Sequence, residues 1–377
     1  MRCTLLLLFI TTPIIEQCFG AVTTGNNAEV AHKLCTLFAG ARGKWETPKS
    51  PDAGQTAYKE MQMLNISLSK PDTKAVFKHV APHTEFQDYP PDAVKNKEEW
   101  KKMYKYWKEA AQPLEIQGKD TNTKTAQLTT ELNDYQKKKL LEWLGPVLAE
   151  ATVIRHKLAE AQTTLEGKNI KDIPSTLNTA LVGRPTDDAT TLTDTDIWKT
   201  NLAGNLNTKC EAAGPTPEEK SLVAVVLCLC SHAGGEGLGK ACFIGHTHPT
   251  QWTPASGSDG TEWTKYKKLC HGPQVVRLTA GSLSTALASL LSTIEIHSGN
   301  AYLGTVDSSG NGNCDGQRTN GICIKFTGAA TATANTNNQQ PVHSQTNRSD
   351  RQLGEAEAAE RDARFLSDKL EGKIAAT

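Results

Sequence analysis

Cysteine placement constrains this chain more than any other feature of its sequence. Two of its ten cysteines, Cys3 and Cys18, lie within the first twenty residues. The other eight are Cys35, Cys210, Cys228, Cys230, Cys242, Cys270, Cys314 and Cys323. An even set of cysteines in an exported protein predicts a disulfide framework, here of four bonds. All but Cys35 come after residue 209, so we expect covalent bracing mainly in the second half of the chain.

The first twenty residues predict a secretory signal peptide. Arg2 supplies a positive charge, and an apolar stretch follows from Leu5 to Ile15. Cys18 and Gly20 place small residues where signal peptidase requires them, before Ala21. The apolar stretch is shorter than the ~20 residues that a membrane-spanning helix needs. We therefore expect export, with an oxidising environment for the eight cysteines.

Spacing favours one cysteine pair directly. Cys314 and Cys323 flank two turn-forming dipeptides, Asp315-Gly316 and Asn320-Gly321. Closing that ring should stabilise the fold by roughly 2–3 kcal/mol. Cys228 and Cys230 are separated by one residue, which strains a mutual bond, so we expect two different partners for them. The other pairings stay open.

Hydrophobic periodicity predicts mainly helices. The expected helices span residues 23–42, 56–68, 93–111 (between Pro90-Pro91 and Pro113 as breakers), 217–230 (capped by Thr216), 279–296 and 351–374. Residues 313–326 are typical of a β-hairpin. Residues 327–350 are polar and of low complexity, which predicts a surface loop.

The longest helical pattern covers residues 122–166. Apolar residues recur there every three or four positions with Lys and Glu between them, which is typical of a coiled-coil arm. Gly145-Pro146 predicts a kink within it. The alternative interpretation is two shorter core helices joined at Gly145.

Two motifs suggest chemistry without meeting its requirements. Residues 234–240 fit the phosphate-loop pattern GxxxxGK, but Ala241 stands where a Ser or Thr would bind Mg²⁺. A zinc site could be drawn from Cys228, Cys230, His232, Cys242, His246 and His248, although Cys-x-Cys and His-x-His spacing suits zinc poorly. We favour a flexible glycine loop and disulfides. We expect no catalytic residues, no cofactor and no metal.

The chain has a balanced charge and two N-glycosylation sequons. Acidic and basic residues balance at 41 each, so nothing indicates nucleic-acid binding. Asn65-Ile66-Ser67 and Asn347-Arg348-Ser349 are N-glycosylation sequons. Their alternative explanation is chance occurrence. Asn347 is the better acceptor because it falls in the expected polar loop.

Three short motifs carry a family resemblance. They are Ala31-His32-Lys33-Leu34-Cys35, then Leu227-Cys228-Leu229-Cys230-Ser231 after an apolar run, and Asn313-Cys314-Asp315-Gly316 leading into the segment 321–326. In this order and spacing, the chain resembles the N-terminal domain of trypanosome variant surface glycoproteins, of the class B type.

The resemblance implies a fold and a domain division. The fold is mainly α, with an elongated antiparallel hairpin of long helices (a coiled-coil stalk), disulfide-rich loop lobes and a small β-hairpin. Residues 1–20 would be the signal peptide, 21–350 the N-terminal domain, and 351–377 a charged helix leading toward a C-terminal domain. The family's usual anchor tail is absent from the chain as written.

The resemblance also implies a function without catalysis. Such a protein would coat the outer face of the plasma membrane through a GPI anchor, exclude host antibodies by dense packing and support antigenic variation. The implied partners are further copies of itself, as a homodimer or trimer, with host antibodies as external binders. Membrane contact would come only through the anchor, and the chain as written would be secreted. The alternative function is a receptor for a host serum protein on a related helical scaffold.

Overall fold

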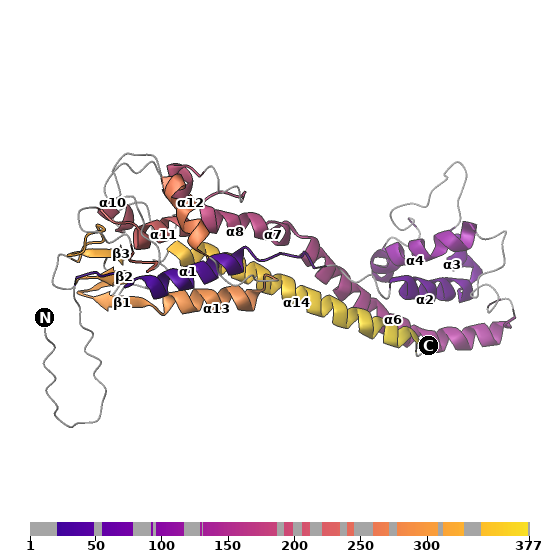
Figure 1. Cartoon of the computed structure of the whole chain (residues 1–377). Helices are drawn as coiled ribbons and strands as arrows, with labels where there is room; N and C mark the ends of the chain where they lie inside the picture. The colour runs from indigo at the N-terminus through magenta and orange to yellow at the C-terminus, as the bar shows by residue number, and fades with distance from the viewer. Residues whose placement is uncertain are drawn as a thin grey trace, which may run out of the picture. The chain divides into compact units, whose positions relative to one another are not determined.

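The computed structural model describes residues 21–48, 55–77, 92, 96–116, 129, 131–186, 192–198, 206–211, 221–233, 240–244, 259–270, 277–307, 312–327 and 341–375. The chain is mainly α, as predicted, with one small antiparallel sheet and four disulfides (Figure 1). It divides into two compact units. The first combines Met1–Glu46 with Asp172–Gly354, and the second combines Thr47–Lys171 with Glu355–Thr377. The predicted signal peptide lies outside the described residues.

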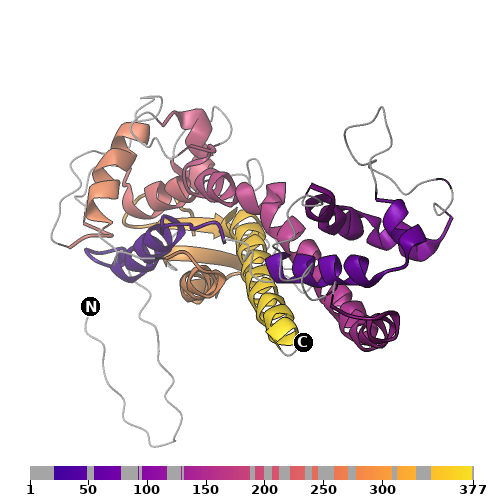
Figure 2. The same cartoon turned by 90° about the vertical axis from the view of Figure 1, so that its right-hand side faces the viewer.

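Among its described residues, the first unit contains seven short helices, a sheet and the start of α14. The helices are α1 (Ala28–Ala41), α8 (Ile173–Val182), α9 (Asp194–Trp198), α10 (Leu206–Cys210), α11 (Leu222–Cys230), α12 (Asp259–Leu269) and α13 (Ala280–Leu291). Helix α1 packs along α13, as Figures 1 and 2 both show. The buried face of α1 includes Leu34, Leu37 and Phe38, which follows the predicted helical spacing.

Helix α11 forms the centre of this unit because all nine of its residues are buried. It contacts α1, α8, α9, α10, α12 and strand β3. The predicted start at residue 217 is wrong for this helix, and Thr216, its predicted cap, lies outside the described residues. The helix begins at Leu222, and the Ser221 hydroxyl accepts a hydrogen bond from the Ala224 amide at 3.3 Å. A serine oxygen there satisfies one of the amide groups left unpaired at a helix start.

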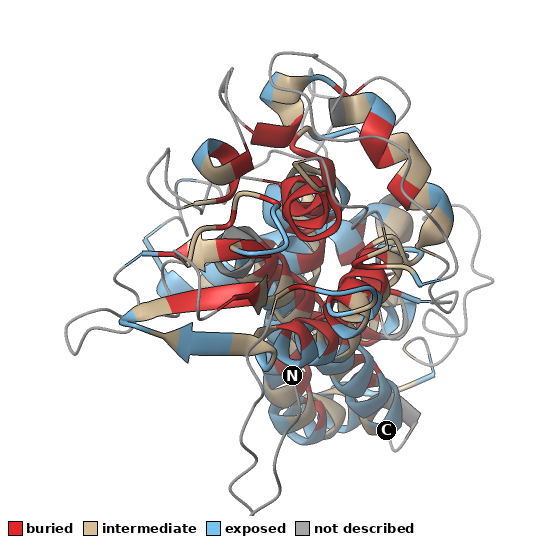
Figure 3. Cartoon of the chain, turned by 60° about the vertical axis from the view of Figure 1, so that its left-hand side comes forward, coloured by how far each residue is buried: buried red, intermediate tan, exposed pale blue. Residues whose placement is uncertain are grey.

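The sheet is an antiparallel meander of β1 (Ile294–His297), β2 (Asn300–Val306) and β3 (Gly321–Phe326), in that order. Most of β3 is buried, whereas the middle of β1 is exposed (Figure 3). Ser298 and Gly299 join β1 to β2 with φ of 47° and 77°, as a tight hairpin turn requires. Two predictions need correction. The helix expected to reach residue 296 ends at Leu291, and the hairpin expected within 313–326 is formed by β3 with β2 instead.

The second unit contains α2 (Gln55–Leu68), α3 (Pro71–Ala75), α4 (Glu98–Ile116), α6 (Asp134–Glu166), α7 (Lys168–Lys171) and the later part of α14 (Pro341–Ala375). Helix α4 continues through Pro113, which was expected to end it. Pro113 lies close to the end of α4. The missing proline N–H therefore removes one hydrogen bond near the last turn, and the helix tolerates that loss better there than in its middle.

Helix α6 is one helix of 33 residues, which gives it a length of roughly 50 Å. The interpretation of two shorter helices joined at Gly145 is therefore wrong. The helix begins at Asp134 instead of residue 122, because Asn133 and Gln136 form a reciprocal capping box. The side-chain oxygen of each accepts a hydrogen bond from the backbone amide of the other at 2.9 Å. A bend at Gly145-Pro146 stays a prediction.

Helices α6 and α14 run antiparallel within this unit. Late residues of α6 (Leu158, Leu165) cluster with earlier residues of α14 (Ala359, Ala363), and Ile154 clusters with Leu370. The register continues to Glu150, which lies 3.5 Å from the Lys369 ammonium and also pairs with Lys373. The long antiparallel helices implied by the resemblance are thus α6 and α14.

Helix α14 also corrects the last ten residues of the loop predicted for 327–350, of which residues 328–340 lie outside the described residues. Residues 341–350 form its first turns, and Thr346 and Ser349 are buried there. The helix passes residue 350 without a break, and the domain division expected there stays a prediction. None of the described helices combines the length and the apolar character needed to cross a membrane.

Candidate functional site

The eight cysteines that the structure describes all lie in the first unit, where they form four disulfides. Cys35 pairs with Cys270, Cys210 with Cys228, Cys230 with Cys242, and Cys314 with Cys323. Cys314–Cys323 is the pair that spacing favoured, and Cys228 and Cys230 do have different partners. The Cys35–Cys270 bond spans 235 residues of sequence and ties α1 to the end of α12. Constraining so long a loop reduces the entropy of the unfolded chain more than a short bond does.

These bonds rule out the zinc alternative at its cysteines. Cys228, Cys230 and Cys242 are all oxidised, and an oxidised sulfur cannot supply the thiolate that zinc binds. His246 and His248 lie outside the described residues. Within the part of the chain that the structure describes, no group of three His, Cys, Asp or Glu side chains could hold a metal ion.

The phosphate-loop candidate is mostly outside the described residues too, which resume at Lys240. The Lys240 backbone carbonyl accepts a hydrogen bond from the Gly25 amide at 3.0 Å, and the neighbouring Ala241 carbonyl accepts one from the Asn27 amide, also at 3.0 Å. Ala241 is fully buried against Val22 and Ile322. The residues after the glycine motif therefore have a structural role in holding residues 22–27.

Asn27 is the polar centre of the disulfide-braced unit, and sequence reasoning missed it. Its side chain is fully buried. The side-chain nitrogen donates to the carbonyls of Leu229 (2.8 Å) and Ile322 (2.7 Å). The side-chain oxygen accepts from the amide and the hydroxyl of Thr305. One amide group thereby joins α1, α11, β2 and β3 in a site where unpaired groups would be costly.

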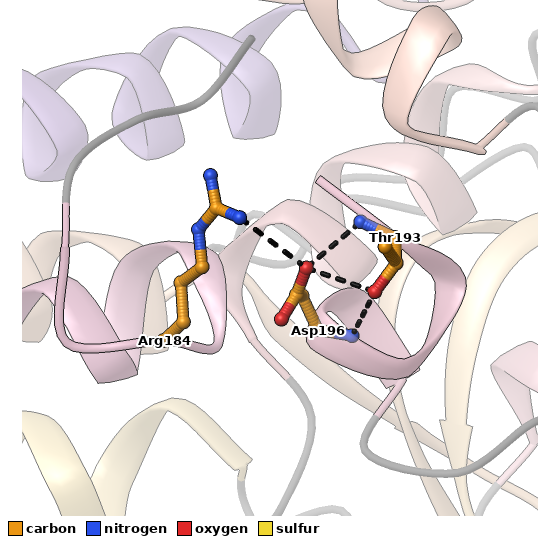
Figure 4. Close-up of polar contacts among 3 residues, drawn as sticks. All are labelled: Arg184, Thr193 and Asp196. Atoms are coloured by element: carbon orange, nitrogen blue, oxygen red, sulfur yellow. Dashed lines mark hydrogen bonds and ion pairs between the residues drawn. The ribbon is translucent and has the colours of Figure 1, made fainter. Parts of the chain in front are cut away.

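The ends of α8 and α9 meet at a second polar site (Figure 4). The Asp196 carboxylate accepts hydrogen bonds from the Thr193 amide (2.8 Å) and hydroxyl (2.9 Å), and the Arg184 guanidinium lies 3.7 Å from the same oxygen. The Thr193 hydroxyl oxygen in turn accepts a hydrogen bond from the Asp196 backbone amide at 3.2 Å, and this bond completes a cap for α9. Gly183 ends α8 with φ of 86°, and a Cβ at that position would lie 1.7 Å from the Asp196 carbonyl oxygen. No sequence pattern indicated this close approach.

The second unit presents a groove between α6 and α14 of about 520 Å³. Ala161, Ala359 and Leu366 form its apolar lining, and Lys157, Glu160 and Asp362 bring charge to it. Phe365 also lines the groove with 66% of its surface exposed, and Val153 on α6 is 55% exposed. Large exposed apolar side chains beside a groove are typical of protein–protein contact surfaces.

Perturbed ionisable groups in the structure have structural causes. Burial raises the pKa of Tyr266 strongly, and a hydrogen bond with Ser231 only partly opposes that effect. The Lys373 ammonium, hydrogen bonded to Glu150, holds the pKa of that carboxyl below its usual value. Neither group lines the groove. They are explained by packing in α12 and by the ion pairs between α6 and α14.

The two sequons lie on helices. Asn65 is half-buried on α2, and its side-chain nitrogen lies 3.4 Å from the Gln62 oxygen. Asn347 is half-buried on α14, and Ser349 of the same sequon is fully buried. The polar loop that favoured Asn347 is therefore not its setting. N-glycosylation at Asn65 and Asn347 stays a prediction.

Comparison with known proteins gives a consistent match. The family model described as "Trypanosomal VSG domain" matches residues 6–372. A curated relative, "Variant surface glycoprotein ILTAT 1.23" of Trypanosoma brucei brucei, is 23% identical over 328 residues. That alignment covers 85% of this chain and 60% of the relative, so the chain spans less than two thirds of the relative's length.

Proposed function

Because the chain belongs to the trypanosomal variant surface glycoprotein family, a family of surface coat proteins, we propose that it shields the parasite plasma membrane from host antibodies. The observation that carries this proposal is the family match over nearly the whole chain. The mechanism is steric. Closely packed copies leave no gap for a large protein to reach the membrane, and no catalytic step is required.

The structure of the first unit supports a coat role. Four disulfides and the buried Asn27 cluster hold its short helices together, so the loops between them can differ among relatives at little cost to the core. Replacement of the expressed relative would then change the exposed loops while the scaffold persists. We propose antigenic variation on that basis. In the mature protein, a C-terminal lipid anchor of the family type would hold this scaffold at the outer face of the membrane.

Self-association is proposed through the groove between α6 and α14. Phe365 and Val153 together expose apolar surface on this helix pair. A second copy could cover both residues, and Lys157, Glu160 and Asp362 could pair with opposite charges across the contact. The number of copies stays open between two and three.

Self-association is tested by the mass of the mature chain in solution across a range of concentrations. We expect Phe365→Ser to weaken association at least about tenfold, because the most exposed apolar side chain of the groove is lost. Ile244→Ser is the matched control, since Ile244 is 62% exposed but belongs to the other unit. An unchanged mass for Phe365→Ser would exclude this face.

The coat function is tested in trypanosomes that carry this protein, with the family's anchor, as the sole abundant surface protein. We expect an antibody against an invariant membrane protein to bind poorly to live cells and well after the coat is removed by protease. Equal binding before and after removal would contradict shielding. Specific retention of one host serum protein by the purified chain would instead favour the receptor alternative.

A further inference from the structure

Strand β1 forms an open edge of the sheet in the first unit. The strand order is β1-β2-β3, and among the described residues no strand pairs with the outer side of β1 (Figures 1 and 3). The middle of this strand is exposed, and Ile296 has 67% of its surface exposed. The outer side of an edge strand presents backbone N–H and C=O groups that can pair with another strand. Strand β1 is therefore a candidate contact surface.

The hairpin turn determines which backbone groups of β1 point outward. Ser298 and Gly299 form a two-residue loop, so the flanking residues His297 and Asn300 are a pair of the hydrogen-bonded type. In an antiparallel ladder, such pairs alternate with pairs that exchange no hydrogen bonds. Ile296 belongs to the next pair along the strand. Its N–H and C=O groups therefore point away from β2, toward the open side of the sheet.

A second copy of β1 is complementary to this edge. In a two-fold contact between identical strands, residues directly opposite each other lie on the same face of the joined sheet. An axis at Ile296 places its outward N–H and C=O groups against those of Ile296 in the second copy, which allows two backbone hydrogen bonds. The same axis places Glu295 opposite His297 of the second copy. An imidazole, whether neutral or positive, does not repel a carboxylate and can hydrogen bond to it.

The other registers of two antiparallel β1 strands are less favourable. An axis at Glu295 places two carboxylates directly opposite each other, and like charges in that position are destabilising. An axis at Ile294 or at His297 lies at an end of the strand, so it pairs β1 with residues outside β1. The register centred on Ile296 is therefore the one that combines strand pairing with compatible charges.

We propose that β1 pairs with β1 of a second copy around a two-fold axis at Ile296, as a contact separate from the groove in the other unit. The pairing closes at two copies, because each β1 is already paired with β2 on its other side. A strand of four residues gives a small contact, which is weak between molecules in dilute solution. Dense packing raises the effective concentration of the second strand, and this last step rests on the proposed coat function.

The test traps this contact with a disulfide in the full mature chain. The Cα atoms of a hydrogen-bonded antiparallel pair lie ~5.5 Å apart, within the range that a disulfide spans. Under mild oxidation, we expect Ile296→Cys to form covalent dimers at least about tenfold faster than Ile244→Cys. Ile244 is the matched control because it is another exposed isoleucine of the first unit. Peptide mapping should find the new bond between the two substituted positions, with the four disulfides of the parent unchanged.

An exchange of charges tests the register. In the Ile296→Cys chain, His297→Glu places a carboxylate opposite Glu295 twice in each dimer and should slow the crosslinking at least about threefold. Adding Glu295→Lys places an ammonium opposite each new carboxylate and should restore the rate. Restoration by a second substitution cannot come from damage to the fold.

Three results would overturn the proposal. They are equal rates for Ile296→Cys and Ile244→Cys, a rate that His297→Glu does not lower, and loss of the crosslink when Phe365→Ser is added. The last arm separates this contact from the groove, because crosslinking at position 296 should persist whether or not Phe365 contributes to self-association. The antibody assay on cells tests shielding without any change in β1, so the two failures are distinguishable.

Discussion

The side-chain oxygen of Asn27 accepts a hydrogen bond from the backbone amide of Thr305 at 2.9 Å, although 278 residues separate the two in sequence. Thr305 lies in β2, in the middle strand of the sheet, and Asn27 directly precedes α1. The contact positions the segment before α1 against the sheet. It shows that the disulfide-braced unit depends on a polar contact as well as on its sulfur bonds.

Asn27→Ala should destabilise the first unit by about 3 kcal/mol or more. The substitution leaves two carbonyl groups and the Thr305 amide and hydroxyl without their partner in a buried site, and each unpaired group costs about 1–3 kcal/mol. The free energy of unfolding from denaturant titration checks this. Asn26→Ala is the control because Asn26 is exposed. Equal stability of the two variants would contradict the role given to Asn27.

Gly183→Ala should be more damaging than its size suggests. The backbone there has φ of 86°, and the new methyl group would lie 1.7 Å from the Asp196 carbonyl oxygen. Backbone movement between α8 and α9 is the only relief, so we expect a loss of at least about 3 kcal/mol or failure to fold. Thermal unfolding and secretion yield report the effect. A variant as stable as the parent would show that this close approach is not part of the fold.

Gly145→Ala, on a different helix, should have the opposite effect and stabilise the protein. Gly145 is exposed within α6, and a Cβ there would meet no atom within 4 Å. Alanine should therefore stabilise the second unit by up to about 1 kcal/mol, mainly by restricting the unfolded chain. The midpoint of denaturant unfolding should rise. A fall would mean that α6 needs glycine flexibility beside Pro146.

Reduction should affect the two units differently. The four disulfides between described residues lie in the first unit, whereas the second is held by apolar clusters between α2, α4, α6 and α14. With reductant, hydrogen exchange should rise sharply in α1, α11 and α12 and much less in α2 and α6. Equal loss of protection in both units would show that the second unit cannot keep its fold without the first.

Acid should weaken the pairing of α6 with α14. The Lys373 ammonium lowers the pKa of Glu150, so this carboxylate stabilises the fold above its unfolded pKa, and that contribution is lost as pH falls through the lower, folded value. Glu150→Gln should therefore show a smaller loss of stability on acidification than the parent. The group is exposed, so the difference should be small and should shrink in high salt. Identical pH profiles would remove Glu150 from this role.

The sequence predicted the elements that local rules control. The spacing of Leu34, Leu37 and Phe38 identified α1, and the short ring between Cys314 and Cys323 identified its disulfide. Local rules misplaced element ends where tertiary contacts decide them. The apolar run up to Ile294 extends beyond the end of α13 at Leu291. Ile294 belongs to strand β1 instead of the helix, and it pairs with Leu303 in the sheet. Polar composition hid the start of α14, where Thr346 and Ser349 are nevertheless buried.

The candidate site was harder to predict for the same reason. Cys35 could have paired with any other cysteine by sequence, and its bond to Cys270 exists because the folded chain brings α1 against the end of α12. Asn27 has the residue type and the position of an ordinary helix N-cap, yet its side chain makes no cap hydrogen bond. It donates hydrogen bonds instead to carbonyls more than 200 positions away. No local pattern encodes contacts of that range.

We propose that this protein acts by occupying space. Its most direct test measures binding to one membrane-proximal epitope on live coated cells with three probes against that epitope: a single-domain antibody, a Fab and a whole antibody. A steric coat predicts that binding falls steeply as probe size rises, and that the difference disappears when coat density is lowered. Equal binding of all three probes at full coat density would contradict steric shielding.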